Sequence, residues 1–359
     1  MFIAGSKAKR NFIAIAGVLL LISVILFSVV GCGGGSSNNQ GGTPSGGGST
    51  AKISFRIDNP TAAGSPFEAG IFKFVELLEQ KTDGRATAQV YSGAILTNND
   101  ASQSMHILRS GDVEAGFLMQ GFFAQIEPRW SIFAMPFLYE NTEQAFEIWD
   151  GEAGQYMLDL LPELGYEGLA YFLSGRSVIT NSVRPVVTPD DLTGLKIRCP
   201  DSPLNLTITS ALGAYPVAMA MGEIFLALQQ GVIDGQFNSL MSIDNRGFYE
   251  VQDYLTMTEH ELVQNVFAMN KKYFDSLPAD IQTAIREAAI EASIYQRKLV
   301  LDAEAGYLKK FADDYSMQIR YLTPAEKQVW IAKAQPVYDE YTSKIGEEVM
   351  NLFYKALGR

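Results

Sequence analysis

The chain has 359 residues, a hydrophobic fraction of 47% and a formal net charge of −12 at pH 7, which is the composition of a globular protein long enough for more than one domain. The acidic balance argues against a nucleic-acid partner, because nucleic-acid phosphates require clustered lysine and arginine. Cys32 and Cys199 are the only cysteines, and neither a CxxC pair nor the spacing of a zinc site occurs, so the sequence predicts no cofactor and no metal.

The first 31 residues have the pattern of a targeting segment. Three positive residues precede an uncharged apolar run from 12 to 30. This run is long enough to span a membrane, so an uncleaved anchor remains an alternative. The run ends in VVGC, which resembles a bacterial lipobox, and residues 32–50 form a Gly/Ser-rich tether. We therefore predict a signal peptide cleaved before Cys32, with Cys32 acylated as the membrane anchor and the protein held in the periplasm or on the outer face of the cytoplasmic membrane.

After the tether, strand and helix patterns alternate. The predicted elements are a strand at 52–57, a helix at 67–78, a strand at 87–91, a helix at 100–109, a strand at 113–119, a helix from 142 and a strand near 169–173. This order is typical of a mostly parallel sheet with helices on both faces.

The same order then restarts, with strands at 195–199, 215–217 and 233–237 and helices at 204–212 and 222–230. Two α/β units predict two lobes, and a cleft between lobes is a favoured ligand site. Residues 278–315 predict a single helix with Ser276 as its N-cap. At about 1.5 Å per residue it would reach about 50 Å and cross both lobes. A coiled coil is the weaker alternative, because alanine and tyrosine occupy its seam.

The stretch GLKIRCPDSP places an arginine at the end of a predicted strand. Leu195 and Ile197 share one face of this strand and Arg198 lies on the other, while Pro200 prevents the strand from continuing. An arginine at the carboxyl end of a strand is a candidate ligand-reading residue in open α/β sheets. A surface ion pair is the alternative. The paired acids Asp190 and Asp191, which follow Pro189 in a turn, are expected to cap a helix.

Three segments resemble the DctP family, the solute-binding proteins of tripartite ATP-independent periplasmic (TRAP) transporters. They are GLKIRCPDSP, LGAYPVAMAMGEIFLALQQGVIDGQFNSL and FYEVQDYLTMTEH, in this order. The resemblance implies an α/β fold of the periplasmic-binding-protein type II class, with two hinge-closing lobes and a long lobe-spanning helix. It also implies an organic-acid ligand, a membrane permease as partner and no enzymatic activity. We assign residues 51–174 and about 264–303 to lobe I, and residues 175–263 and about 304–359 to lobe II.

The resemblance also places ligand-binding residues. It puts the carboxylate-reading arginine at Arg198, a second arginine at Arg176 and an amide donor at Asn238. A guanidinium matches a carboxylate bidentately and stays charged, and an amide donates without adding charge. Without the resemblance, Asn238 would be interpreted as a turn residue and Arg176 as a loop arginine. The other predicted ligand-binding positions are Asp58, Asn59, Asn98, Met119, Gln120 and Met221.

Two methionines depart from the family pattern. Met119 stands where relatives that take sugar acids carry an acidic residue, and Met221 stands where several relatives have an aromatic residue. If both line the cleft, they favour a ligand with an apolar body behind its carboxylate; core packing is the alternative.

A ligand-sensing binding protein of the same fold that feeds a receptor also fits the sequence. An enzyme finds no support, because neither GxSxG nor HExxH occurs.

Overall fold

The computed structural model describes residues 52–98 and 100–359. The predicted signal peptide, Cys32 and the tether lie outside these residues. No helix within the described ranges is long and apolar enough to cross a membrane.

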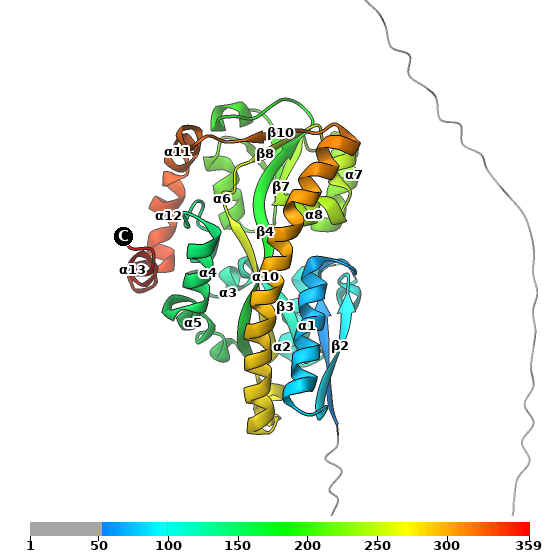
Figure 1. Cartoon of the computed structure of the whole chain (residues 1–359). Coiled ribbons are helices and arrows are strands. Elements are labelled where there is room, and N and C mark those ends of the chain that lie inside the picture. The colour runs from blue at the N-terminus through cyan, green and yellow to red at the C-terminus, as the bar shows by residue number, and fades with distance from the viewer. Residues whose placement is uncertain (1–51, 99) are drawn as a thin grey trace, which may run out of the picture. The chain divides into compact units, whose positions relative to one another are not determined.

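The described residues form a ten-stranded mixed sheet with the main order β2-β1-β3-β9-β4-β7-β5-β6 (Figure 1). β8 pairs with β4, and β10 pairs with β8. The strands are β1 Ile53–Asn59, β2 Ala86–Ser92, β3 Ala115–Met119, β4 Tyr166–Asn181, β5 Lys196–Cys199, β6 Tyr215–Ala218, β7 Gly235–Ser239, β8 Tyr254–Met257, β9 Leu262–Asn270 and β10 Gln318–Tyr321. Because β9 is antiparallel to β3 and β4, and β7 is antiparallel to β4, the expected parallel pairing occurs only within each half of the sheet.

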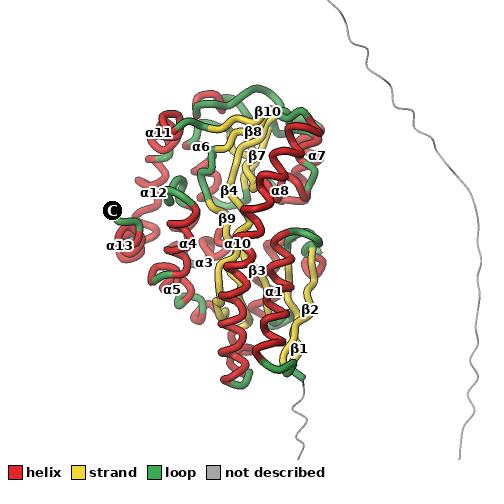
Figure 2. Tube along the Cα trace, viewed as in Figure 1, coloured by secondary structure: helices red, strands yellow, loops and turns green. Residues whose placement is uncertain are grey.

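Helices flank the strands on both sides (Figure 2). They are α1 Pro66–Lys81, α2 Ser104–Ser110, α3 Gln120–Ile126, α4 Thr142–Asp150, α5 Glu152–Leu158, α6 Pro203–Ala211, α7 Ile224–Gln229, α8 Leu240–Asn245, α9 Lys271–Ser276, α10 Ala279–Tyr315, α11 Pro324–Lys333, α12 Gln335–Ile345 and α13 Glu347–Ala356. Short 3-10 helices lie between them, including η3 Pro128–Ala134, η5 Pro189–Leu192 and η6 Met221–Glu223.

Strand β4 joins the two halves of the sheet. Its residues up to Arg176 pair with β9, and its residues from Ser177 onward pair with β7. We call residues 173–177 the crossover, the first half the part built on β1, β2, β3 and β9, and the second half the part built on β5 to β8 and β10. The pairing directions make β1 and β3 run toward the crossover from one side and β5 and β7 from the other. The carboxyl ends of these four strands therefore face one another across the junction.

Helix α10 confirms the predicted long helix and extends along both halves (Figure 1). It packs on α1 and β4 and reaches α8. α1 and α10 approach closely at Gly70, because a Cβ at this position would collide with the side chain of Gln296. The predicted N-cap was wrong. Ser276 ends α9, where its hydroxyl donates to the carbonyl of Tyr273 at 2.6 Å, and Pro278 occupies the N-cap position of α10.

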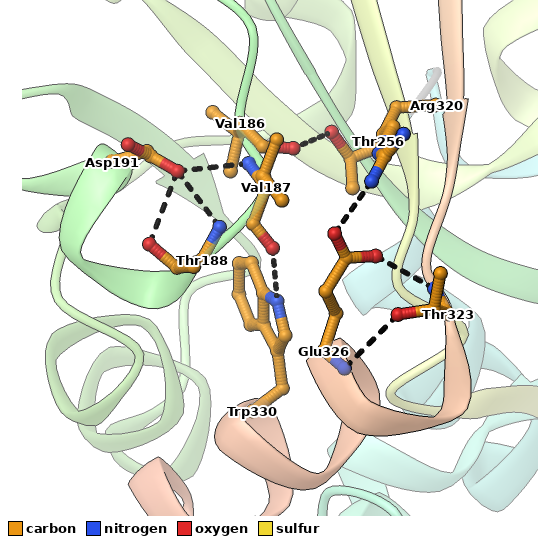
Figure 3. A network of polar contacts seen from close by, with 9 residues as sticks. All are labelled: Val186, Val187, Thr188, Asp191, Thr256, Arg320, Thr323, Glu326 and Trp330. Atoms are coloured by element: carbon orange, nitrogen blue, oxygen red, sulfur yellow. Dashed lines mark hydrogen bonds and ion pairs between the residues drawn. The ribbon is translucent and has the colours of Figure 1, made fainter.

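Polar contacts attach α11 to the second half (Figure 3). The indole nitrogen of Trp330 donates to the carbonyl of Val187 at 2.9 Å. Of the two acids expected to cap a helix, Asp191 does so, since its carboxylate accepts from the backbone N–H of Thr188 at 2.8 Å in the capping box of η5, whereas Asp190 lies 3.7 Å from the ammonium of Lys333. Glu326 makes the same kind of capping box at the start of α11.

The last two helices pack on segments that precede β4 in the chain. α12 packs on η3 and α6, and α13 packs on α5 and η3. Helix α12 thus bridges segments that the sequence assigned to different lobes, and α13 packs on segments assigned to lobe I. The lobe boundaries stay a prediction, although the boundary expected after residue 174 falls within the crossover.

Candidate functional site

Arg198 is a buried cation that pairs with no anion among the described residues. It lies one residue before the end of β5, is 3% exposed, and its Nε donates to the carbonyl of Met219 at 2.9 Å. Burial lowers the pKa of Arg198 to about 10, so the side chain stays protonated at neutral pH. Within the described part of the chain, no carboxylate forms an ion pair with it, and the surface ion pair considered from the sequence is not formed. A buried charge left without a counter-charge is costly, which makes this guanidinium a ready partner for an anion.

Asn238 and Met221 belong to the two segments that flank Arg198, strand β7 and the connection after β6. Arg198 pairs across the ladder with Gln236 of β7, so Arg198, Gln236 and Asn238 share one face of the sheet. The side-chain nitrogen of Asn238 lies 3.8 Å from the sulfur of Met221, at the start of η6. A thioether is a weak acceptor, so the amide can donate to a better one. A cation, an amide donor and a thioether therefore lie near the carboxyl ends of the strands β5 and β7 in the second half.

The first half holds buried hydrogen-bond acceptors near the carboxyl ends of β1 and β3. Asp58, in β1, is 1% exposed, and one of its carboxylate oxygens accepts from the hydroxyl of Ser104 at 2.6 Å. The other oxygen has no hydrogen-bond partner among the described residues, and burial raises the pKa of this carboxyl. Gln120 follows β3 and donates to the carboxylate of Glu261 at 2.7 Å, while its own carbonyl oxygen has no partner in residues 52–98 and 100–359. Burial raises the pKa of Glu261 to about 7.

The remaining positions predicted for the first half differ in what they offer a ligand. Met119 ends β3 and is partly exposed. The amide nitrogen of Asn59 donates to the hydroxyl of Ser92 at 3.0 Å, and its oxygen accepts from the backbone N–H of Thr61 at 3.0 Å. Asn59 therefore holds the turn after β1. Asn98 is exposed and adopts a left-handed backbone conformation with φ of 52°.

Arg176 is engaged in ion pairs. Its Nε donates to Glu304 of α10 at 2.9 Å, its Nη1 to Glu259 at 2.9 Å, and its Nη2 also to Glu304. All three guanidinium nitrogens thus contact carboxylates of this chain. The resemblance implies that Arg176 is the second ligand-binding arginine, which stays a prediction; in this structure its partners are Glu304 and Glu259.

Glu261 and Ser104 were missed by the sequence-based reasoning. Glu261 is the residue before β9, and its only direct side-chain hydrogen bond in the described structure is the one from Gln120. No local pattern marks it, because β9 itself was not predicted. Among the side chains described here, no group of three or more His, Cys, Asp or Glu residues could hold a metal ion.

Comparisons with known proteins give the family. The model of the DctP family, described as "Bacterial extracellular solute-binding protein, family 7", matches residues 59–344. The 2,3-diketo-L-gulonate-binding periplasmic protein YiaO of Escherichia coli strain K12 is 33% identical over 254 residues, which cover 71% of this chain and 77% of that protein. The uncharacterized protein y4mM of Sinorhizobium fredii is 35% identical over 261 residues, 73% of this chain but 48% of that protein. The chain therefore spans about half the length of y4mM.

Solved structures share the fold. The sugar acid binding protein DctPAm of Advenella mimigardefordensis, in complex with galactonate, matches with a TM-score of 0.80 and 30% identity over 86% of this chain and 98% of that chain. A TRAP periplasmic solute binding protein of Shewanella oneidensis with bound succinate matches with a TM-score of 0.79 and 28% identity over 86% of this chain and 100% of that chain. These matches confirm the two-lobe α/β fold with its long helix, and the chain belongs to the DctP family, family 7 of the bacterial extracellular solute-binding proteins.

Proposed function

We propose that this protein is the extracytoplasmic solute-binding lipoprotein of a TRAP transporter. It captures an organic acid through its carboxylate and delivers the acid to a membrane permease. The single observation that carries the proposal is the buried guanidinium of Arg198, which has no anionic partner among the described residues. The relatives support the ligand class, since galactonate and succinate, bound in two similar structures, are both carboxylates.

The proposed binding mode follows from the geometry of the second half. The Nε of Arg198 is held by the carbonyl of Met219, which orients the two terminal nitrogens as a fork for a carboxylate. Asn238 on the neighbouring strand donates a neutral hydrogen bond to one of the same oxygens. The guanidinium of Arg198 is already shielded from water before the ligand binds. Binding a carboxylate therefore requires little further dehydration of the guanidinium.

Closure of the two halves about the crossover completes the proposed site. The carboxyl ends of β1 and β3 face those of β5 and β7, so closure brings acceptors of the first half toward the distal part of the ligand. Hinge closure around a ligand is a common response of two-lobed binding proteins. Lipid attachment at Cys32 would keep the binding protein at the membrane, near its permease.

A thermal-shift screen of organic acids tests the proposal. A ligand that binds only the folded state stabilises it by about 2.7 kcal/mol when present at a hundredfold excess over its Kd. We expect at least one acid to raise the melting temperature, and its neutral analogue, for example a sugar compared with the sugar acid, to have no effect. If no organic acid changes the melting temperature, or if acid and neutral analogue act equally, the proposal is wrong.

A further inference from the structure

Helix α10 holds the backbone of β4 on either side of the crossover bulge. The side-chain amide of Gln296 accepts from the backbone N–H of Leu173 at 2.8 Å and donates to the carbonyl of the same residue at 2.7 Å. Two turns further along α10, Glu304 contacts Arg176. The register of β4 against β9 shifts between Leu173 and Gly175, so the two attachments enclose an irregular stretch of strand. The crossover is therefore fixed to α10 at two points.

Arg176 connects three segments at this place. Glu304 belongs to α10, and Glu259 belongs to the connection between β8 and β9. The second carboxylate oxygen of Glu259 lies 3.9 Å from the ammonium of Lys327 in α11. Glu259 has a positive φ of 47°, a conformation that non-glycine residues rarely adopt and that surrounding contacts must hold. Arg176 thus links the crossover strand to α10 and, through Glu259, to α11.

The surroundings of Arg176 are those of a satisfied cation. Its partner Glu304 has a side chain that is only 4% exposed, so solvent screens this pair little. Two carboxylates already face one guanidinium, and an incoming ligand carboxylate would have to displace one of them against the charge of both. Arg198 differs from Arg176 because it is buried and has no anion beside it in the described structure.

We propose that Arg176 is a positioning residue of the hinge, which clamps the β4 crossover to α10 and to the β8–β9 connection and so sets how readily the two halves close, without contacting the ligand. This inference rests on the proposed function. It gives Arg176 a role different from that of the second carboxylate-reading arginine implied by the family resemblance. Since the clamp acts on the protein and not on the ligand, its loss should weaken the binding of every acid by a similar factor.

The test compares Arg176→Met, Glu304→Gln and the double variant by calorimetry, with one monocarboxylate and one dicarboxylate that stabilise the wild-type protein. We expect each single variant to raise Kd by about two- to thirtyfold, by similar factors for both acids. The double variant should lose less than the product of the two factors, because both changes break one clamp. Arg176→Lys, which keeps one ion pair, replaces Arg176→Met if that variant does not fold.

A matched control and a second readout separate the clamp from general damage. Arg286 of α10 pairs with Glu167 of β4 at 2.5 Å, so Arg286→Met breaks an ion pair between the same two elements away from the crossover, and Kd should stay within about twofold of the wild type. Spin labels introduced at the exposed positions Phe72 of α1 and Leu226 of α7 report the distance between the halves. Without ligand, the clamp variants should give a broader distance distribution than wild type or Arg286→Met.

The outcomes that overturn the inference are distinct. If Arg176→Met raises Kd more than about a hundredfold while Glu304→Gln leaves Kd unchanged or lowers it, Arg176 reads the ligand directly. If both variants match the wild type in Kd and in label distances, the clamp has no effect on closure. If no acid binds the wild-type protein, the proposed function is wrong. The clamp is then tested by the label distances of the unliganded proteins alone, which should be more broadly distributed in the clamp variants than in the wild type.

Discussion

Replacing Arg198 should abolish tight binding without harming the free protein. Truncation to alanine leaves the ligand carboxylate in a buried site without its charged partner. Breaking such a pair costs about 3–5 kcal/mol, which corresponds to an increase in Kd of roughly 10²- to 10³·⁵-fold. Arg198→Lys keeps the charge but loses the fork of donors, so it should weaken binding less than alanine does.

The melting temperatures of the unliganded variants show whether Arg198 also stabilises the fold. Since Arg198 is buried with no counter-charge in the described structure, Arg198→Met removes an uncompensated charge, and the melting temperature should stay the same or rise. Arg297 is the matched control, a buried arginine that bonds Asp150 at 2.7 and 2.8 Å and donates to the carbonyl of Tyr171. Both substitutions leave a backbone carbonyl without its arginine donor, that of Met219 or that of Tyr171, but Arg297→Met also leaves Asp150 without its cation and should therefore cost about 1–3 kcal/mol more stability than Arg198→Met.

Calorimetry and thermal denaturation on the same preparations give both numbers, with circular dichroism as the check on folding. If Arg198→Ala binds the wild-type ligand within a few-fold of the parent, Arg198 does not hold the ligand carboxylate. If Arg198→Met melts as far below the wild type as Arg297→Met does, Arg198 is a structural residue.

Three further predictions concern the site, the pH response and the anchor. Asn238→Ala removes one neutral hydrogen bond and should weaken binding by about 1–3 kcal/mol in calorimetry; an unchanged Kd would remove Asn238 from the site. The pKa of Glu261 is raised from 4.5 to about 7, so the folded state holds a proton that the unfolded state has lost, and the contribution of Glu261 to stability falls as pH rises from about 4.5 to about 7. Glu261→Gln should flatten the decline of the unfolding free energy across this window, and an identical pH profile for both proteins would contradict the assignment. Cys32→Ala should leave an unprocessed precursor on a gel, and processing and membrane retention like those of the parent would exclude the lipoprotein signal.

Local patterns predicted the elements that carry the site. Strand alternation followed by Pro200 located the end of β5, and with it Arg198, to within one residue. The apolar periodicity of residues 278–315 predicted α10, because a helix of this length leaves a repeated signal. Its N-cap was predicted wrongly because Ser276 is the last residue of the short helix α9, which the sequence did not indicate, and its hydroxyl bonds within that helix.

Contacts between distant parts of the chain could not be predicted. Arg176 meets Glu304 across 128 residues, and no local pattern relates the two. Strand β9 was missed, and with it the antiparallel pairing that makes the sheet continuous and places Glu261 at the junction. The family resemblance supplied the residue types of the site, whereas the partners of those residues depend on how the two halves meet.

A crystal structure of the protein with an acid that stabilises it is the most direct test of carboxylate capture by Arg198. We predict that the ligand carboxylate lies within hydrogen-bond distance of the terminal nitrogens of Arg198 and of the amide nitrogen of Asn238, while Arg176 stays paired with Glu304. A carboxylate bound elsewhere, with Arg198 still without an anion, would contradict it.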